Sequence, residues 1–202
     1  WLIKQCKVLI FETYKPTEIV DFLWAGPEYN RDKEKKAAFF SLLNVNESLL
    51  NNRQISNVGF VKISDTSDFC IKQKAIKYYL PKDCVFAYKQ KLSFLEEPIL
   101  EVFALKNNSW QLPLYKMVDS VKKKNAWRGE PAIFIQFNKI GKYRFKTLTR
   151  KNIANSLAFV IDGLVYSAPF VNGEIEGGKS EISGDFSETE AKYLAYMISG
   201  GF

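Results

Sequence analysis

The sequence predicts an α+β protein whose helices lie on one face of a mostly antiparallel sheet. In the first hundred residues the predicted elements run strand, helix, strand, helix, strand, strand. That order is typical of helices packed on one face of antiparallel strands. A composition of 47% hydrophobic, 25% charged and 15% aromatic residues is that of a globular chain with large side chains to fill a core.

The first half of the chain alternates strand-like and helix-like segments. β-branched and aromatic residues predict strands over residues 7–14, 57–63, 84–88 and 99–105. Pro16 suits the first turn of a helix that ends at Gly26-Pro27, and Asp65 is expected to cap a second helix that stops at Pro81. The charged residues 30–36 are predicted to form a loop.

The second half begins with a predicted strand at residues 114–121, which leads into the basic run 122–124. Alternating apolar residues predict a strand at 132–137, and a helix is expected at 141–152. Residues 157–161 and 164–170 form the clearest hairpin, because Asp162-Gly163 suits the positive-φ positions of a type I′ turn. Pro169 is expected to end the second strand of that hairpin.

The last predicted elements are a short strand and a helix. Gly177-Gly178 predicts a tight turn before a strand at 181–183. Ser187 and Glu190 have the spacing of a capping box at the start of the final helix. Gly200 stands where a left-handed residue often ends a helix.

Histidine is absent from the sequence. Its absence excludes Ser-His-Asp and Cys-His nucleophile systems, and zinc sites that need imidazole. Asp162 is assigned to its turn, and Ser167 lacks the partner that a nucleophile needs. We therefore expect no catalytic residue, metal site or cofactor; an enzyme that uses paired carboxylates is the least favoured alternative.

Cys6, Cys70 and Cys84 are the cysteines of the chain. Their odd number excludes complete pairing within the chain. Cys70 and Cys84 could form a disulfide if the fold brings a helix and a strand together, but buried free thiols are the favoured reading.

The formal net charge is +7, and six basic residues without an acid lie between positions 139 and 151. A solvated helix face is the favoured role for this stretch. The alternative is contact with anionic lipid headgroups or acidic peptide, through Lys139, Lys142, Lys146 and Arg150. No nucleic acid partner is expected. Trp110 and Trp127 are candidates for exposed aromatic residues, although core packing is the favoured role. No apolar run reaches the roughly 18–20 residues that cross a bilayer.

An ordered set of motif residues runs through the last third of the chain. The set consists of Gly141, Phe145, Asn152, Asp162, Gly163, Ser167, Ala168, Pro169, Gly177, Gly178, Gly184, Phe186, Glu190 and Ala191. On these residues, the stretch 137–201 resembles the first extracytoplasmic domain of the SecD/SecDF protein-export family. A fainter likeness extends over most of the remaining chain, and the family usually has glycine where Ala154 stands.

The resemblance implies two lobes. A ferredoxin-like base, with helices on a mostly antiparallel sheet, is expected from residues 1–111 with 185–202, and an inserted α+β head from residues 112–184. The chain would cross between the lobes at Asn107-Asn108 and at Gly184-Asp185, which are the candidate hinges. The motif residues are expected to be mainly structural.

The resemblance also implies a function without bond chemistry. The chain would be the extracytoplasmic, periplasmic-side domain of a SecDF-type translocase subunit that engages unfolded preprotein and Sec translocon components late in export. Membrane helices or an anchor outside these residues would attach it to the cell membrane. The alternative is a soluble or lipid-anchored SecD-like paralogue that acts as a protein-interaction module without translocation activity.

Overall fold

The computed structural model describes residues 8–24, 33–43, 45, 56–91, 98–107, 114–127, 129–161, 163–183 and 186–200. The expected α+β class is confirmed in these ranges. The chain divides into two compact units: the middle unit, Glu12–Asn108, and the C-terminal unit, Trp1–Phe11 with Ser109–Phe202. The division falls inside β1 (Val8–Thr13), so each unit takes part of that strand.

The middle unit is built on an antiparallel sheet. Its other elements are α1 (Pro16–Trp24), α2 (Lys33–Phe40), β2 (Asn57–Lys62), η1 (Ile63–Asp65), α4 (Thr66–Ile76), η2 (Lys77–Tyr79), β3 (Cys84–Lys91) and β4 (Ile99–Lys106). β4 is the central strand: it pairs with β3 along its full length, from Cys84 opposite Lys106 to Lys91 opposite Ile99. On its other edge β4 pairs with β2 and with the last residues of β1.

Aromatic rings join the helices of the middle unit to its sheet. The ring centroid of Phe39 in α2 lies 5.0 Å from that of Phe69 in α4 and 5.9 Å from that of Phe86 in β3. The prediction of a loop at residues 30–36 is wrong from residue 33 onward, where α2 begins. The charge of this stretch was misleading because Lys36 is buried, with its ammonium 4.4 Å from the ring centre of Tyr79.

The start of α4 also differs from its prediction. Asp65 is the N-cap residue, but its side chain accepts no capping hydrogen bond. The carboxylate accepts instead from the hydroxyl of Ser64, and the hydroxyl of Thr66 donates to the carbonyl of Ile63. A preceding 3-10 turn gives Asp65 a ψ of 2°, far from the extended backbone that a capping side chain requires.

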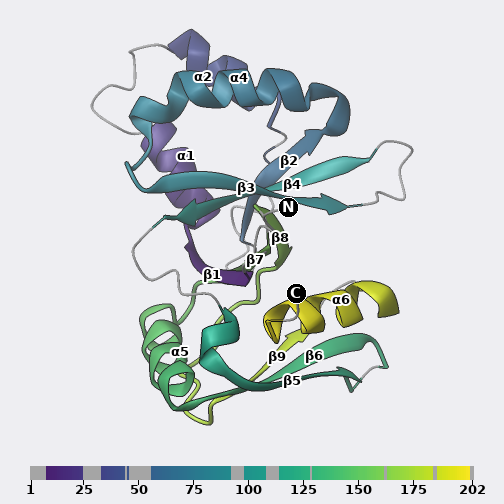
Figure 1. Cartoon of the computed structure of the whole chain (residues 1–202). Coiled ribbons are helices and arrows are strands. Elements are labelled where there is room, and N and C mark those ends of the chain that lie inside the picture. Colours follow the sequence, from purple (N-terminus) through teal and green to yellow (C-terminus); the bar gives the residue numbers. More distant parts are fainter. Residues whose placement is uncertain are drawn as a thin grey trace, which may run out of the picture. The chain divides into compact units, whose positions relative to one another are not determined.

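The C-terminal unit holds the remaining elements. These are η3 (Leu114–Met117), β5 (Val118–Asn125), β6 (Pro131–Phe137), α5 (Lys139–Lys151), β7 (Leu157–Ile161), β8 (Leu164–Ser167), β9 (Lys179–Ser183) and α6 (Glu188–Ile198). β5, β6 and β9 form a three-stranded antiparallel sheet with β6 in the middle. α6 lies along one face of that sheet (Figure 1). β7 pairs with β8 and lies next to β1.

The apolar core of the C-terminal unit joins α5 and α6 to the strands. Ile133 and Ile182 from the three-stranded sheet share one buried cluster with Leu194 and Ile198 of α6. The capping box of Ser187 and Glu190 is confirmed, since each side chain accepts a hydrogen bond from the other residue's backbone N–H. Gly200 follows the helix with a φ of +80°, as predicted.

The strand predicted at residues 114–121 lies further along the chain. Leu114–Met117 forms a 3-10 turn, and the strand runs over Val118–Asn125, so it contains the basic run 122–124. Leu114 and Met117 are both buried, and three residues is the spacing that places two side chains on one side of a 3-10 turn. The two apolar side chains therefore pack from the turn into the core, and they do not indicate a strand.

The hairpin of β7 and β8 is confirmed. β8 ends at Ser167, before Pro169, and Gly163 has the positive φ of +83° that its turn requires. The pairing shifts by one residue between Phe159 and Val160. Asp162 lies outside the described residues.

The two compact units divide the chain differently from the lobes expected from the resemblance. The expected division placed residues 185–202 with the first 111 residues, whereas the C-terminal unit keeps α6 with β5 and β6. The physical reason is the apolar cluster that α6 shares with these strands. Of the helices in the described ranges, none combines the length and apolarity needed to cross a membrane.

Candidate functional site

The motif residues of α5 hold that helix in place. Gly141 is buried against the backbone of Met117. Phe145 stacks on Phe137 of β6, with ring centroids 4.5 Å apart. Asn152 is the C-cap residue, and its side-chain amide donates to the carbonyl of Leu148 at 2.9 Å. All three residues therefore serve packing or helix termination.

The motif residues after β7 shape the return of the chain. The hydroxyl of Ser167 donates to the carbonyl of Ser183 at 3.2 Å, which ties β8 to the end of β9. Ala168 is half-buried, and the carbonyl of Pro169 accepts from the N–H of Leu157 at 3.1 Å. Beyond Ser167, the chain thus stays hydrogen-bonded to the segment that starts β7.

The remaining motif residues lie at the turn before β9 and at α6. Gly178 has a φ of +66°, and its carbonyl accepts from the N–H of Phe137 and from the side-chain amide of Gln136. Gly177 is exposed beside it. Phe186, which follows β9, and Ala191 in α6 are buried in the core. Gly184 lies outside the described residues.

The four basic residues proposed for surface contact do not have one environment. Lys139, Lys142 and Arg150 are exposed on α5, and the stem of Lys142 lies over Gly178. Lys146 is bound within the unit: its Nζ lies 2.6 Å from Glu176 Oε1 and 3.2 Å from Glu174 Oε1. These contacts raise the pKa of Lys146 and lower the pKa of Glu176. Lys146 thus fastens α5 to the segment before Gly178.

The candidate hinge residues fall mostly outside the described residues. This holds for Asn108, Gly184 and Asp185. Asn107 is described, and its N–H donates to the carbonyl of Asp83 at 2.7 Å, within the middle unit.

The β5–β6–β9 sheet has one face covered by α6 and one face open to solvent. Strand register places side chains of the open face in rows across the sheet. One row is Lys122, Phe134 and Glu181, and the next is Ser120, Gln136 and Lys179. Because side chains alternate between the faces of a strand, Ile133, Ile135 and Ile182 point the other way, into the core.

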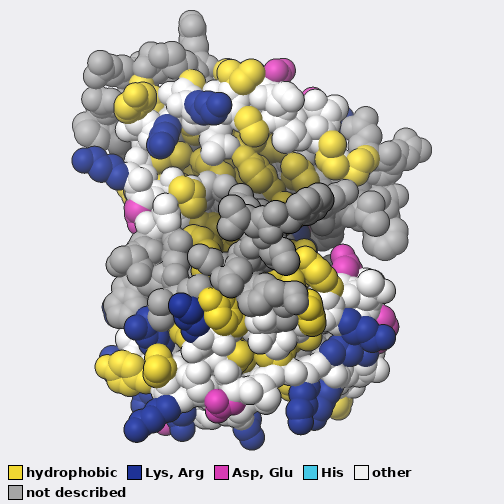
Figure 2. Space-filling view, viewed as in Figure 1, with side chains coloured by type: hydrophobic (Ala, Val, Ile, Leu, Met, Phe, Trp, Pro, Cys, Tyr) yellow, Lys and Arg dark blue, Asp and Glu magenta, His cyan; other side chains and the backbone are white. Residues whose placement is uncertain are grey.

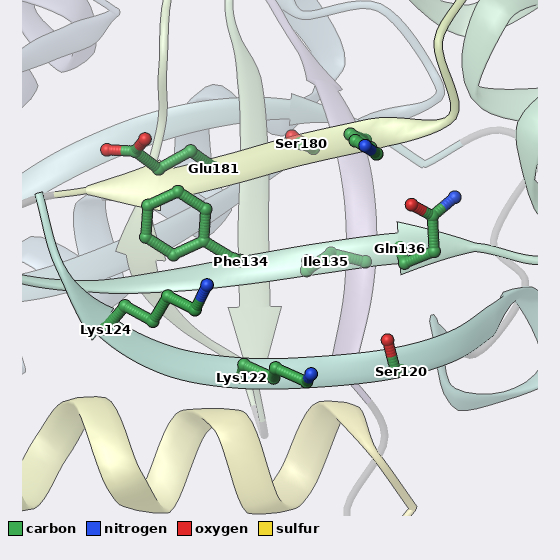
Figure 3. A pocket seen from close by; sticks show the side chains of 9 residues that line it. Ser120, Lys122, Lys124, Phe134, Ile135, Gln136, Ser180 and Glu181 are labelled. Atoms are coloured by element: carbon green, nitrogen blue, oxygen red, sulfur yellow. The ribbon is translucent and has the colours of Figure 1, made fainter.

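The open face forms a shallow groove of about 620 Å³. Phe134 lies in its middle, half-buried, between the two edge strands (Figure 3). The ammonium of Lys124 lies 5.8 Å from the centre of the Phe134 ring. Lys122, Lys124 and Lys179 are exposed along the groove, and Glu181 is the acid that lines it. The groove therefore offers an aromatic surface with an excess of positive charge.

Sequence reasoning missed this groove. Its residues come from three strands far apart in the sequence, and Lys122 and Glu181 come to flank Phe134 only through the pairing register. The available signal was the run Lys122, Lys123 and Lys124, because a strand places Lys122 and Lys124 on one face and Lys123 on the other. The preference for core packing at Trp127 is also wrong, because Trp127 is 97% exposed beyond the end of β5. Trp110 lies outside the described residues.

The cysteines of the middle unit are free thiols. Cys84 is buried and Cys70 is half-buried, so the open question of a bond between them is settled in favour of free thiols. Cys6 lies outside the described residues.

Basic side chains also gather on the surface of the C-terminal unit shown in Figure 2.

The comparisons with known proteins all give matches that are described as SecD or SecDF. The profile described as the SecDF P1 head subdomain matches residues 114–202. The protein translocase subunit SecD of Calditerrivibrio nitroreducens is 31% identical over 124 residues, which cover 60% of this chain and 24% of that protein. The protein translocase subunit SecDF of Thermus thermophilus is 38% identical over 73 residues, 36% of this chain and 10% of that protein.

A solved structure titled as a membrane component SecDF that enhances protein export is 33% identical to this chain. It covers 45% of this chain and 42% of its own, with a TM-score of 0.41. The chain spans about a quarter or less of the curated relatives given above. The matched range 114–202 contains α6, in agreement with the apolar cluster that joins α6 to β6.

Proposed function

We infer, from the premise that this chain is a SecD/SecDF P1 domain, that it binds exported polypeptide in unfolded form on the extracytoplasmic side of a membrane. The observation that carries the proposal is the match of residues 114–202 to the SecDF P1 head subdomain. The relatives named as protein translocase subunits give the context in which such a domain would work. The domain would act in late translocation, beside other Sec components, through binding and release without bond chemistry.

A strand edge in the C-terminal unit supports this role. β5 is an edge strand of the three-stranded sheet, so among the described residues one side of its backbone has no strand paired with it. An extended polypeptide can add to such an edge through main-chain hydrogen bonds, which give affinity with little sequence selection. The lysines of β5 disfavour uncontrolled pairing of other strands at this edge. We therefore expect a polypeptide that binds there to be released again.

The proposal includes a two-lobed arrangement in which a head moves against a ferredoxin-like base. Asn107-Asn108 would be its crossing, whereas the second crossing expected from the sequence, Gly184-Asp185, falls within the C-terminal unit. The boundary between the compact units falls at Asn108, which supports the first crossing. Membrane segments elsewhere in the full protein would hold the domain at the periplasmic side of the cell membrane.

Binding to an unfolded secretory protein tests the proposal. The probe is a fluorescently labelled secretory protein whose cysteines are reduced and alkylated so that it stays unfolded. We expect saturable binding to the 202-residue chain by fluorescence anisotropy, and none to the same protein in its folded, oxidised form. Absence of saturable binding, or equal binding of both forms, would contradict the proposed function.

A further inference from the structure

The lysines of the basic run 122–124 in β5 have different surroundings on the two faces of the β5–β6–β9 sheet. On the covered side, Lys123 forms an ion pair with Glu188 of α6. Lys122 and Lys124 point to the open side, as alternation within a strand requires. In the part of the chain that the structure describes, neither of these two lysines has a carboxylate within ion-pair distance. The fold thus neutralises one lysine of the run and leaves two facing the groove.

The charge of the groove is uneven from one edge to the other. Lys122 and Lys124 line its β5 side and Glu181 its β9 side (Figure 3). Lys179, also on β9, lines the groove as well. Only the β9 side therefore holds both signs of charge among the lining residues. A bound carboxylate would be favoured at the β5 side and disfavoured close to Glu181.

Phe134 supplies the apolar part of the groove. Its ring lies between the β5 lysines and Glu181, and its half-burial leaves part of the ring in contact with solvent. The ammonium of Lys124 near the ring is an exposed cation–π contact, which is weak and easily exchanged for a carboxylate. An apolar side chain over Phe134 would cover this ring and remove it from water.

The spacing of the two free lysines suits an extended chain. Lys122 and Lys124 are two residues apart on one strand, so their Cα atoms are separated by about 6.6–6.8 Å. Acidic residues two apart on a second extended chain have the same spacing. We therefore propose that the open face of the β5–β6–β9 sheet binds extended acidic segments of polypeptide, with alternate carboxylates on Lys122 and Lys124 and an apolar side chain on Phe134. This inference rests on the proposed function and names the class of segment that it selects.

A matched pair of peptides tests the inference on the 202-residue chain. The first is a labelled twelve-residue peptide with Asp at alternate positions and one central Leu, and the second has Asn in place of each Asp. We expect the Asp peptide to bind at least about 10-fold more tightly at low salt, with the difference shrinking as salt is added. Equal affinity of the two peptides, or no saturable binding of the Asp peptide, would overturn the inference.

Charge reversal locates the site. The double variant Lys122→Glu, Lys124→Glu should lose at least about 10-fold in affinity for the Asp peptide, because like charges would then face each other. The control Lys74→Glu, Lys192→Glu makes the same change of net charge at exposed positions of α4 and α6, and should bind as the unmodified chain does. Circular dichroism checks that both variants fold. If the first does not, Lys122→Gln, Lys124→Gln replaces it, with a smaller loss expected.

Two further outcomes separate the possibilities. If the unfolded secretory protein binds the Lys122→Glu, Lys124→Glu variant as tightly as the unmodified chain, and the Asp peptide does too, the groove is not the site although the proposed function stands. Vesicles with and without anionic lipid form a second arm. Lysine-dependent binding to anionic vesicles, without binding of the Asp peptide, would overturn the inference in favour of a lipid surface.

Discussion

Gly141 of α5 packs so closely against Met117 that a Cβ at residue 141 would lie 2.9 Å from the Met117 carbonyl carbon and closer still to its oxygen. Real Cβ atoms do not approach backbone this closely, so any other residue must push α5 away from the turn before β5. The helix would then lose its stacking of Phe145 on Phe137 as well.

Gly141→Ala should therefore destabilise the chain by about 2–3 kcal/mol, although alanine is the better helix former. Urea unfolding measures the change. Gly177→Ala is the matched control, since a Cβ there meets nothing within 4 Å, and it should change stability little. Equal effects of the two substitutions would contradict the role assigned to Gly141.

Ala154 carries a left-handed backbone, with a φ of 62°. This conformation costs an L-residue roughly 1–2 kcal/mol, and glycine adopts it freely at some cost in chain entropy. Ala154→Gly should therefore stabilise the chain by about 0.5–1 kcal/mol, seen as a higher urea midpoint. Ala195→Gly inside α6 should instead lower stability by about 1 kcal/mol. Destabilisation by Ala154→Gly would show that its backbone is not strained.

The ion pairs of Lys146 predict a dependence of stability on pH. Hydrogen bonding to Lys146 lowers the pKa of Glu176 in the folded chain, so its contribution is present above the unfolded pKa of 4.5 and is lost as pH falls through the lowered value. Glu176→Gln should therefore be less stable than the unmodified chain at pH 7. The difference should shrink as pH falls below 4.5 and vanish once the pH is below the lowered pKa of the folded chain. A difference that stays constant across this range in denaturant unfolding would contradict the assignment.

Cys84 should be unreactive at neutral pH. Burial, with the Asp83 carboxylate as the next cause, raises the pKa of its thiol to about 12. The thiolate is the reactive form, so Cys84 should react with an aromatic disulfide reagent far more slowly than the half-buried Cys70 between pH 7 and 9. The comparison uses Cys6→Ser with either Cys70→Ser or Cys84→Ser. Similar rates for the two thiols would show that Cys84 is accessible.

Local sequence signals predicted much of the fold. The turn at Gly163, the capping box at Ser187 and the left-handed Gly200 each follow from residues a few positions apart, and the structure has all three features. The prediction failed where distant contacts decide the environment. Lys36, the last residue of the predicted loop 30–36, lies buried in α2 with its ammonium near the Tyr79 ring. Leu114, predicted in a strand, lies in a 3-10 turn with its side chain buried in the core.

The binding groove was beyond such local signals. Phe134 looks like any apolar residue of an alternating strand, and nothing near it in sequence places Glu181 on one side and Lys122 on the other. The motif residues, by contrast, could be identified from the sequence, but they serve packing and turns. Gly141 packs against Met117, and Gly178 lies in the turn before β9.

Photo-crosslinking tests most directly whether the C-terminal unit holds unfolded polypeptide. Benzoylphenylalanine replaces Phe134 in the groove or, as the control, Tyr78, which is 94% exposed in the middle unit. With the unfolded secretory protein, irradiation should give adducts from position 134 that the Asp peptide suppresses, and far fewer from position 78. Adducts of equal or greater yield from position 78, insensitive to the peptide, would contradict the account.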